Sequence, residues 1–240
     1  MWAIQPGPAA MRRALPSGRS YTQKIQALGP IAYYPQAEPS GTTIGDESGN
    51  GRNGTYVGVT LGQPGIGDGR TAAGYDGATS YGNIYSASLA GAFNGAEGTI
   101  VAWQRSSGSS SRCILRLQVD ASNLVQLFTT TNANEVQFRY TAGGTVKQIL
   151  DSSNVFGVLF PIALTWSKSN DQARAYAKGV QVGTTQTGLG TWAGTLATTL
   201  CCIGAASTTP TLSWLGSLAH TAIFNRALSA AEIASLAVVP

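Results

Sequence analysis

Apolar and polar residues alternate with a period of two along most of this chain. In residues 136–141, Val136, Phe138 and Tyr140 alternate with polar residues, and residues 112–120 repeat the pattern. Successive side chains of a β-strand point to opposite faces, so this alternation predicts antiparallel strands with one face in a core. The predicted strands are residues 31–35, 55–59, 72–76, 81–84, 99–105, 112–120, 124–130, 136–141, 146–150, 160–167, 174–182, 196–204 and 213–225.

Two short stretches have the features of helices instead. Ser20 can cap a helix over residues 20–28 that has one apolar face and ends before a Gly-Pro pair. Ser229, followed three residues later by Glu232, forms a capping box for a second helix over 229–237. Between the strands, turns recur at intervals of roughly 8–12 residues, which favours a sandwich or a barrel over alternating strands and helices.

The chain divides into a short arm and one large domain. Residues 1–19 are rich in proline, glycine and alanine, which predicts an extended arm. Residues 20–240 contain every predicted strand and both helices. We expect them to form a single all-β domain, a two-sheet antiparallel sandwich with the short helices at its margin.

The net charge of +4 lies in the N-terminal region rather than in the domain. Of the 15 lysines and arginines, four precede residue 38, and the remaining 11 match the 11 acidic residues in number. A neutral body argues against nucleic acid as the main partner. Arg12, Arg13 and Arg19 predict an attachment arm, because arginines pair with carboxylates in a fixed fork. The alternative is a frayed terminus without a role.

The sequence has no apolar stretch of 18 residues, so no membrane span is expected. Three prolines and three arginines interrupt its first 19 residues, which lack the apolar region of a secretory signal. We therefore expect synthesis and use without export. The cysteines at 113, 201 and 202 have no metal-site or disulfide spacing and are expected to be core thiols.

The stretch DESGNGRNGTY, residues 46–56, matches the beginning of two known loop patterns. A dinucleotide-binding loop needs a helix after its glycines, but the strand-like TYVGV follows Gly54. A calcium loop of the EF-hand type needs a carboxylate at its twelfth position, which counted from Asp46 is Val57. The remaining interpretation is a series of turns in which Gly and Asn adopt positive φ.

Several segments resemble a known fold family. LGPIAYYPQAEPSGTTIGDESGNGRNGTYVG is similar to the first strand and loop of laminin-G-like, concanavalin A-like jelly rolls. The likeness continues in GDGRTAAGYDGATSYGNI and GTIVAWQR, and returns in FPIALTWSKSNDQARAYAKGVQVG and GSLAHTAIFNRALSAAEIASLA. It covers about residues 21–237 and implies a jelly-roll fold, although fold alone does not give an activity.

Some members of this family bind calcium near the first loop, which makes Asp46 the candidate metal ligand. Ala219, His220 and Ser80 stand where the resemblance expects acidic residues. Because hard cations need several oxygen ligands, their absence argues against calcium, and we expect no cofactor.

Catalytic groups are sparse. Glucanases with a similar fold carry closely spaced carboxylates, whereas the five glutamates here are scattered and the one histidine, His220, has no acidic neighbour in sequence. A catalytic triad would need a serine that the fold brings close to His220. Trp192, in a Gly/Thr-rich loop, Tyr81 and Tyr85 are candidates for stacking on a sugar, and the alternative is a loop tryptophan folded over the sandwich edge.

The resemblance and the charged arm together predict a non-enzymatic protein. Jelly rolls of this kind behind a short arm look like surface proteins of tailed-phage particles. We therefore expect a capsid or tail decoration protein, made in the host cytoplasm and located in the virion, where it contacts other virion proteins as part of an oligomeric particle. Contact with host-cell carbohydrate is the expected binding activity, strengthened by many copies. The rival hypotheses are a free bacterial lectin and a glycoside hydrolase.

Overall fold

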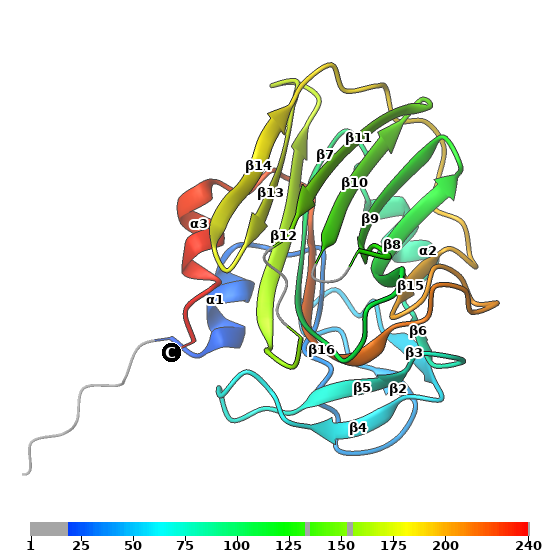
Figure 1. Cartoon of the computed structure of the whole chain (residues 1–240), viewed down its shortest axis with the longest axis vertical. Coiled ribbons are helices and arrows are strands. Elements are labelled where there is room, and N and C mark those ends of the chain that lie inside the picture. Colours follow the sequence, from blue (N-terminus) through cyan, green and yellow to red (C-terminus); the bar gives the residue numbers. More distant parts are fainter. Residues whose placement is uncertain (1–18, 133–134, 153–155, 240) are drawn as a thin grey trace, which may run out of the picture.

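The computed structural model describes residues 19–132, 135–152 and 156–239. Two antiparallel sheets of eight strands each lie face to face (Figure 1), as the alternating pattern predicts. Sheet A contains β1 (Ala32–Tyr34), β4 (Thr60–Gln63), β5 (Ala72–Asp76), β7 (Glu97–Ser106), β12 (Phe160–Ser167), β13 (Gln172–Ala177), β14 (Val180–Gln186) and β16 (Leu215–Phe224). Sheet B contains β2 (Thr43–Ile44), β3 (Gly54–Val57), β6 (Tyr81–Asn83), β8 (Arg112–Asp120), β9 (Asn123–Thr129), β10 (Val136–Ala142), β11 (Thr145–Asp151) and β15 (Cys201–Ile203).

Neighbouring strands of each sheet come from distant parts of the chain. The order in sheet A is β14-β13-β12-β7-β16-β5-β4, with β1 also paired to β16. The order in sheet B is β11-β10-β9-β8-β15-β6-β3-β2. This topology brings β7, β16, β5 and β4 side by side, and these four strands later carry the candidate site.

The main core lies between the sheets. Trp166 of β12 is fully buried there, where its ring stacks on Tyr140 of β10 at a centroid distance of 5.8 Å. The Trp166 indole and the Tyr140 hydroxyl both donate to the carbonyl of Gly95, so neither buried polar group lacks a partner. Trp166 and Tyr140 therefore join the two sheets across this core.

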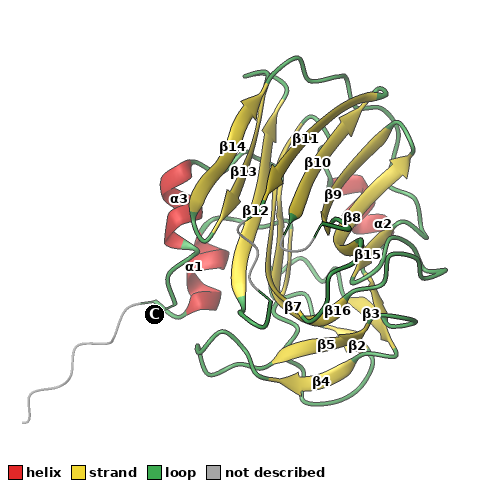
Figure 2. Cartoon of the chain, viewed as in Figure 1, coloured by secondary structure: helices red, strands yellow, loops and turns green. Residues whose placement is uncertain are grey.

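A second core covers the outer face of sheet A. Helix α1 (Tyr21–Ala27) and helix α3 (Ala230–Ser235) lie together against this face (Figure 2). Trp103 of β7 packs under α1 and donates to the Tyr21 hydroxyl at 2.6 Å, and Tyr21 in turn donates to the carbonyl of Leu236. For the centre of sheet A, the expectation of one buried face was wrong, because every residue of β12 is buried.

Both predicted helix caps are present. Ser20 accepts from the amide of Gln23, whose side chain bonds back to the Ser20 amide, and α1 follows. Ser229 and Glu232 form the same reciprocal pair at the start of α3. These local hydrogen bonds satisfy amides that have no partner within a helix, which is why they could be recognised from sequence.

Several predicted elements need correction. The predicted strand 174–182 is a hairpin of β13 and β14, because Lys178 and Gly179 both adopt positive φ and reverse the chain. Of the predicted strand 196–204, Cys201–Ile203 alone is a strand. Helix α2 (Ala87–Ala92), capped by Ser86, was not predicted, nor were β2 and β4. These elements are short, and their patterns are too brief to identify.

Candidate functional site

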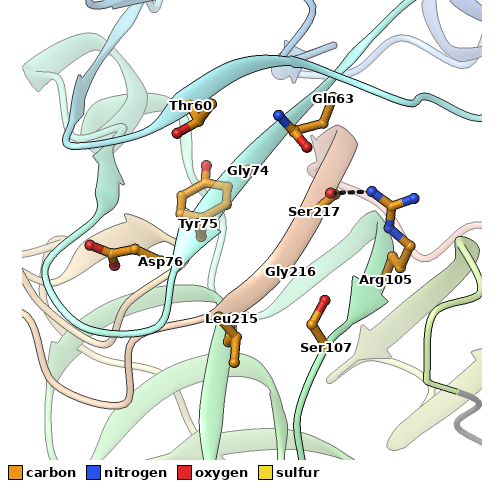
Figure 3. Close-up of a pocket in the computed structure, with 10 residues that line it drawn as sticks. All are labelled: Thr60, Gln63, Gly74, Tyr75, Asp76, Arg105, Ser107, Leu215, Gly216 and Ser217. Carbon is orange, nitrogen blue, oxygen red and sulfur yellow. Dashed lines mark hydrogen bonds between the residues drawn. The ribbon is translucent and has the colours of Figure 1, made fainter.

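A polar recess opens on the outer face of sheet A, beside the area that the helices cover. We name it the Arg105 recess, and its volume is about 280 Å³. Figure 3 shows its lining, contributed by strands β4, β5, β7 and β16 and the residue after β7. The lining residues are Thr60, Gln63, Gly74, Tyr75, Asp76, Arg105, Ser107, Leu215, Gly216 and Ser217.

The recess exists because small residues lie where three strands meet. Gly74 of β5 pairs in register with Ser217 of β16, and Ser217 pairs with Arg105 of β7. A Cβ atom on Gly74 would come within 2.9 Å of the Gln63 side chain, and one on Gly216 within 2.0 Å of the Arg105 carbonyl oxygen. Glycine at both positions therefore lets the neighbouring strands and the Gln63 side chain approach closely.

A β-bulge in β4 places two polar side chains on the rim. Thr60 pairs with Gly74, but Gln63 pairs with Ala72, so the register shifts between them around Gly62, which has a φ of 76°. Residues three apart on a regular strand point to opposite faces, whereas the extra residue of the bulge brings both Thr60 and Gln63 to the outer side. An isolated glycine in a short extended run was the available sequence signal for this bulge.

Arg105 supplies the positive charge of the recess. Its side chain lies on the same strand face as Trp103, two residues earlier, and it donates through Nη2 to Ser217 Oγ at 2.8 Å. Within the described ranges, no Asp or Glu forms an ion pair with it. The guanidinium is always charged near neutral pH and has five N–H donors, so it has capacity to bind an additional acceptor.

Asp76 lines the same recess, but its oxygens are engaged by its own turn. Oδ1 accepts from the amides of Ala78, Thr79 and Ser80 and from the Ser80 hydroxyl, and Oδ2 accepts from the Thr79 hydroxyl. Burial by itself would raise the pKa of Asp76, but these hydrogen bonds outweigh burial and hold the pKa far below its ordinary value. A carboxyl held ionised in this way is poorly suited to act as a general acid.

A second hollow, which we name the α3 recess, lies on the same outer face near the start of α3 and has a volume of about 340 Å³. Arg226 and Glu232 form a two-pronged ion pair there, with N–O distances of 3.0 and 2.8 Å. The hydrogen bond from Arg226 is the largest cause that lowers the pKa of Glu232 to about 2. The lining residues are Thr165, Ser167, Asn170, Gln172, Arg174, Arg226, Ala227, Leu228, Ser229 and Glu232.

Asp46, the candidate calcium ligand, organises its own loop. Its Oδ1 accepts from the amides of Tyr33 and Ser48, and its Oδ2 accepts from the Ser48 hydroxyl and the Arg52 amide. Gly49 and Gly51 have positive φ, as the interpretation of this stretch as turns expects, but Asn50 and Asn53 do not, so glycine alone supplies this conformation here. Among the residues that the structure describes, no three His, Cys, Asp or Glu side chains gather into a group that could hold a metal.

The three candidate aromatic residues do not form one stacking platform. Trp192 is partly buried, lies on Gly95, and packs its ring against Phe93 and Tyr140 at centroid distances of 5.5 and 6.2 Å. This is the position expected of a loop tryptophan folded over the sandwich edge. Tyr81 lies on β6, paired with a β3 residue, and Tyr85 packs on the main core. Within the described ranges, no aromatic contact joins these two tyrosines to Trp192.

His220 has an acidic neighbour that the sequence did not reveal. Its Nε2 lies 3.2 Å from Asp68 Oδ2, and its Nδ1 lies 2.7 Å from the Tyr33 hydroxyl. The imidazole is fully buried under α1 and has a φ of 49°, within the bulge of β16. Burial is the largest influence on Asp68 and by itself would raise the pKa, but the interaction with His220 and the hydrogen bonds from backbone amides together outweigh burial, so the pKa is lowered. This cluster is buried, and its imidazole packs against the Tyr21 ring of the outer core.

Two of the scattered glutamates meet at a third hollow of about 240 Å³. Glu38 accepts from the Gly45 amide and the Tyr56 hydroxyl, at 2.7 and 2.9 Å. Glu47 forms an ion pair with Arg70 at 2.7 Å. Both carboxylates therefore have partners within the protein, and each holds a loop segment in place.

The remaining predicted residues have simple locations. Arg12 and Arg13 lie outside the described residues, and Arg19 is exposed at the first described position. The three cysteines are free and buried, which confirms the expectation of core thiols. Burial raises the pKa of the Cys113 thiol to about 11, so it is not a reactive thiolate near neutral pH. No described helix is long enough to cross a membrane.

The family model described as concanavalin A-like lectin/glucanases superfamily, of the Laminin_G_3 type, matches residues 76–234. The chain belongs to this superfamily. The matched region includes most of both sheets and all of the lining of the Arg105 recess except Thr60, Gln63, Gly74 and Tyr75. Among curated proteins, none matches the sequence.

Solved structures with a similar fold include domains of larger proteins. Domain 4 of AbnA, an extracellular arabinanase of Geobacillus stearothermophilus solved with arabinotriose, has a TM-score of 0.66 at 17% identity, covering 87% of this chain and 98% of that domain. The binding domain of Paraclostridial Mosquitocidal Protein 1 has a TM-score of 0.64 at 15% identity, covering 88% and 52%. Trypanosoma rangeli sialidase with the inhibitor DANA gives 0.59 at 12% identity, covering 86% and 32%. Identities this low show the superfamily fold alone.

Proposed function

We propose that this superfamily member is a non-enzymatic glycan-binding protein that uses the Arg105 recess. The observation that carries the proposal is the combination of hydrogen-bond donors in the recess with a charged arginine that no described carboxylate pairs. Sugars are recognised through many hydroxyl groups, which need such donors and acceptors arranged in a concave surface. The similar fold of an arabinanase domain solved with arabinotriose supports the same ligand class.

Two observations support a role without catalysis. The carboxylates of Asp76 and Glu38 accept hydrogen bonds from backbone amides, and the carboxylate of Glu47 forms an ion pair with Arg70. Glycoside hydrolysis needs one carboxyl group as an acid and a second as a base or nucleophile, both facing the bound sugar. His220 and Asp68 are buried together, and among the described residues no serine hydroxyl lies within hydrogen-bond distance of the imidazole.

A glycan-array screen of the purified protein, followed by a hydrolysis assay on every glycan that binds, tests both parts. We expect binding without turnover. Turnover that disappears in Glu38→Gln, Glu47→Gln or Asp76→Asn would overturn the non-enzymatic role. Failure to bind any glycan on the array would overturn the glycan-binding role.

We further propose that the jelly roll is displayed on the surface of a tailed-phage particle, through attachment by residues 1–19. The concentration of Arg12, Arg13 and Arg19 in that segment supports this setting, because the domain itself is nearly neutral. The test compares incorporation into particles of the full chain and of a chain that begins at Ser20. Normal incorporation of the shortened chain would show that the arm does not attach it.

A free bacterial carbohydrate-binding lectin is the second candidate. It is favoured by the 98% coverage of AbnA domain 4, a domain of an extracellular enzyme. Finding the protein in culture fluid that contains no particles would support this candidate against the virion setting.

A further inference from the structure

We propose that the Arg105 recess recognises the anionic group of an acidic sugar residue, a carboxylate or a sulfate. This inference rests on the proposed glycan-binding function and names the class of sugar. The proposal combines a charge that has no acidic partner among the described residues, polar side chains around it and a volume suited to one sugar residue.

The charge of the recess is asymmetric. Arg105 and Asp76 lie at opposite sides of the view in Figure 3, and the Asp76 side chain does not point toward the guanidinium. Five hydrogen bonds from the 76–80 turn already engage the Asp76 oxygens, whereas among the described residues the Arg105 side chain has one hydrogen-bond partner, the neutral Ser217 hydroxyl. A guanidinium binds a carboxylate or sulfate through parallel N–H donors, and such charged hydrogen bonds are about twice as strong as neutral ones.

Uncommitted polar side chains surround the guanidinium. In the part of the chain that the structure describes, the side chains of Thr60, Gln63 and Ser107 make no hydrogen bond. Figure 3 shows them on three sides of the recess, around Ser217 and Arg105. An amide and two hydroxyl groups can each donate and accept, which matches the hydroxyl groups of a sugar ring.

The size of the recess limits what it can hold. Its volume of about 280 Å³ is slightly below the roughly 300–1,000 Å³ typical of small-molecule pockets. A single terminal residue of a glycan fits this volume better than an extended chain. The acidic group of that residue would contact Arg105, and its hydroxyl groups would contact the rim that Gln63 and Thr60 form.

The test measures binding of three small probes to the full chain by NMR or calorimetry at low ionic strength. The probes are methyl glucuronide, which has a carboxylate, glucose 6-sulfate, and uncharged methyl glucoside. We expect at least one acidic probe to bind about tenfold more tightly than methyl glucoside, and the comparison of the two acidic probes distinguishes carboxylate from sulfate. Added salt should weaken that preference.

Two variants locate the preference. Arg105→Gln should bind the acidic probes no better than methyl glucoside, and Arg105→Lys should recover part of the preference, because lysine keeps the charge without the planar fork. The matched control is Arg174→Gln, which removes an arginine from the same face of sheet A but in the α3 recess, and it should bind like the unaltered protein. Melting curves confirm that each variant is folded.

The failure of this inference can be distinguished from the failure of glycan binding. Equal affinity for methyl glucoside and both acidic probes would overturn the acidic preference, while a positive glycan array would still support the proposed function. A preference that survives Arg105→Gln would place the acidic group elsewhere and overturn the assignment to this recess. Absence of binding by all three probes would also overturn the inference, and the array would then decide the proposed function independently.

Discussion

The Arg105 recess and the α3 recess lie on the same face of sheet A, and Arg105 differs from Arg226 in its partners. Arg174, the second arginine of the α3 recess, resembles Arg105, because it contacts the neutral side chains of Thr185 and Gln172. In the α3 recess, Arg226 is bound by both oxygens of Glu232, and Glu232 also caps its helix. In the Arg105 recess, the arginine contacts a serine hydroxyl. The helix cap explains the difference, because Glu232 is required at the start of α3 and lies within reach of Arg226.

The comparison shows that an arginine in a hollow is not by itself a binding residue. Arg226 joins the 225–229 segment to α3 and to the carbonyl of Leu28, so its donors hold three parts of the chain together. Arg105 makes no comparable set of contacts within the described ranges. Available donors, rather than charge alone, therefore distinguish the candidate binding site from a structural ion pair.

The largest effect is expected when a new carboxylate is placed beside Arg105, since the carboxylate of Asp76 in the same recess is engaged by its own turn. Gln63→Glu changes one atom type and leaves the side chain the same size. The new negative charge should pair with Arg105 and weaken binding of methyl glucuronide by at least about tenfold, as measured by calorimetry.

The matched control for Gln63→Glu is Gln172→Glu, the same change in the α3 recess. It should leave the affinity for methyl glucuronide unchanged. If the two variants lose affinity equally, the distinction between the recesses is wrong.

A smaller effect is expected when the α3 recess loses its carboxylate. Glu232→Gln weakens both the ion pair and the capping box, and should lower the free energy of unfolding at pH 7 by about 1 kcal/mol. For a chain of this size, the melting temperature should fall by about 2–4 °C. Sugar binding at the Arg105 recess should be unaffected.

The pH dependence of Glu232→Gln follows from the pKa of Glu232, lowered to about 2. A lowered pKa gives stabilisation that is complete above the ordinary value of about 4.5 and is lost as pH falls through 2. Melting curves of the two proteins should therefore differ at pH 7 and converge toward pH 2. A difference that grows in acid would contradict this assignment.

Calcium should have almost no effect on either recess or on the Asp46 loop. The four donors around Asp46 are protein groups, and the described residues form no group of three metal ligands. A ligand that binds the native state must raise the melting temperature, so melting in excess calcium and in excess chelator should nearly coincide. An upward shift in calcium that Asp46→Ala removes would identify a metal site.

The smallest effect is expected from removal of residues 1–19. A chain that begins at Ser20 keeps the capping box of α1 and the buried Tyr21, whose hydroxyl links Trp103 to Leu236. Its melting temperature and its affinity for methyl glucuronide should match those of the full chain. A marked loss of stability would mean that residues 1–19 contribute to the fold of the domain.

Most of the fold could be predicted because its causes are local. The alternation in β10 and the capping boxes at Ser20 and Ser229 depend on residues a few positions apart. The Lys178-Gly179 hairpin was missed because a lysine at positive φ is not a common turn signal. Helix α2 was missed because two buried residues, Leu89 and Ala90, do not establish a period.

Most of the candidate site could not be predicted, because its residues come from segments that are distant in the sequence. Gly62 of β4 and Arg105 of β7 are more than forty residues apart, so no local pattern joins the segments that line the recess. The aromatic candidates illustrate the same limit. Trp192 lies in a loop, as its sequence suggests, but its contacts with Phe93 and Tyr140 come from distant segments.

The sequence by itself determined that this protein is an antiparallel β-sandwich with capped helices at its margin, because side-chain periodicity and caps act over a few residues. The tertiary structure decided that β4, β5, β16 and β7 adjoin, that Ser217 rather than a carboxylate meets Arg105, and that Asp68 meets His220. These contacts between distant residues depend on strand order, register and bulges. These are set by the packing of the whole domain, so no local stretch of sequence encodes them.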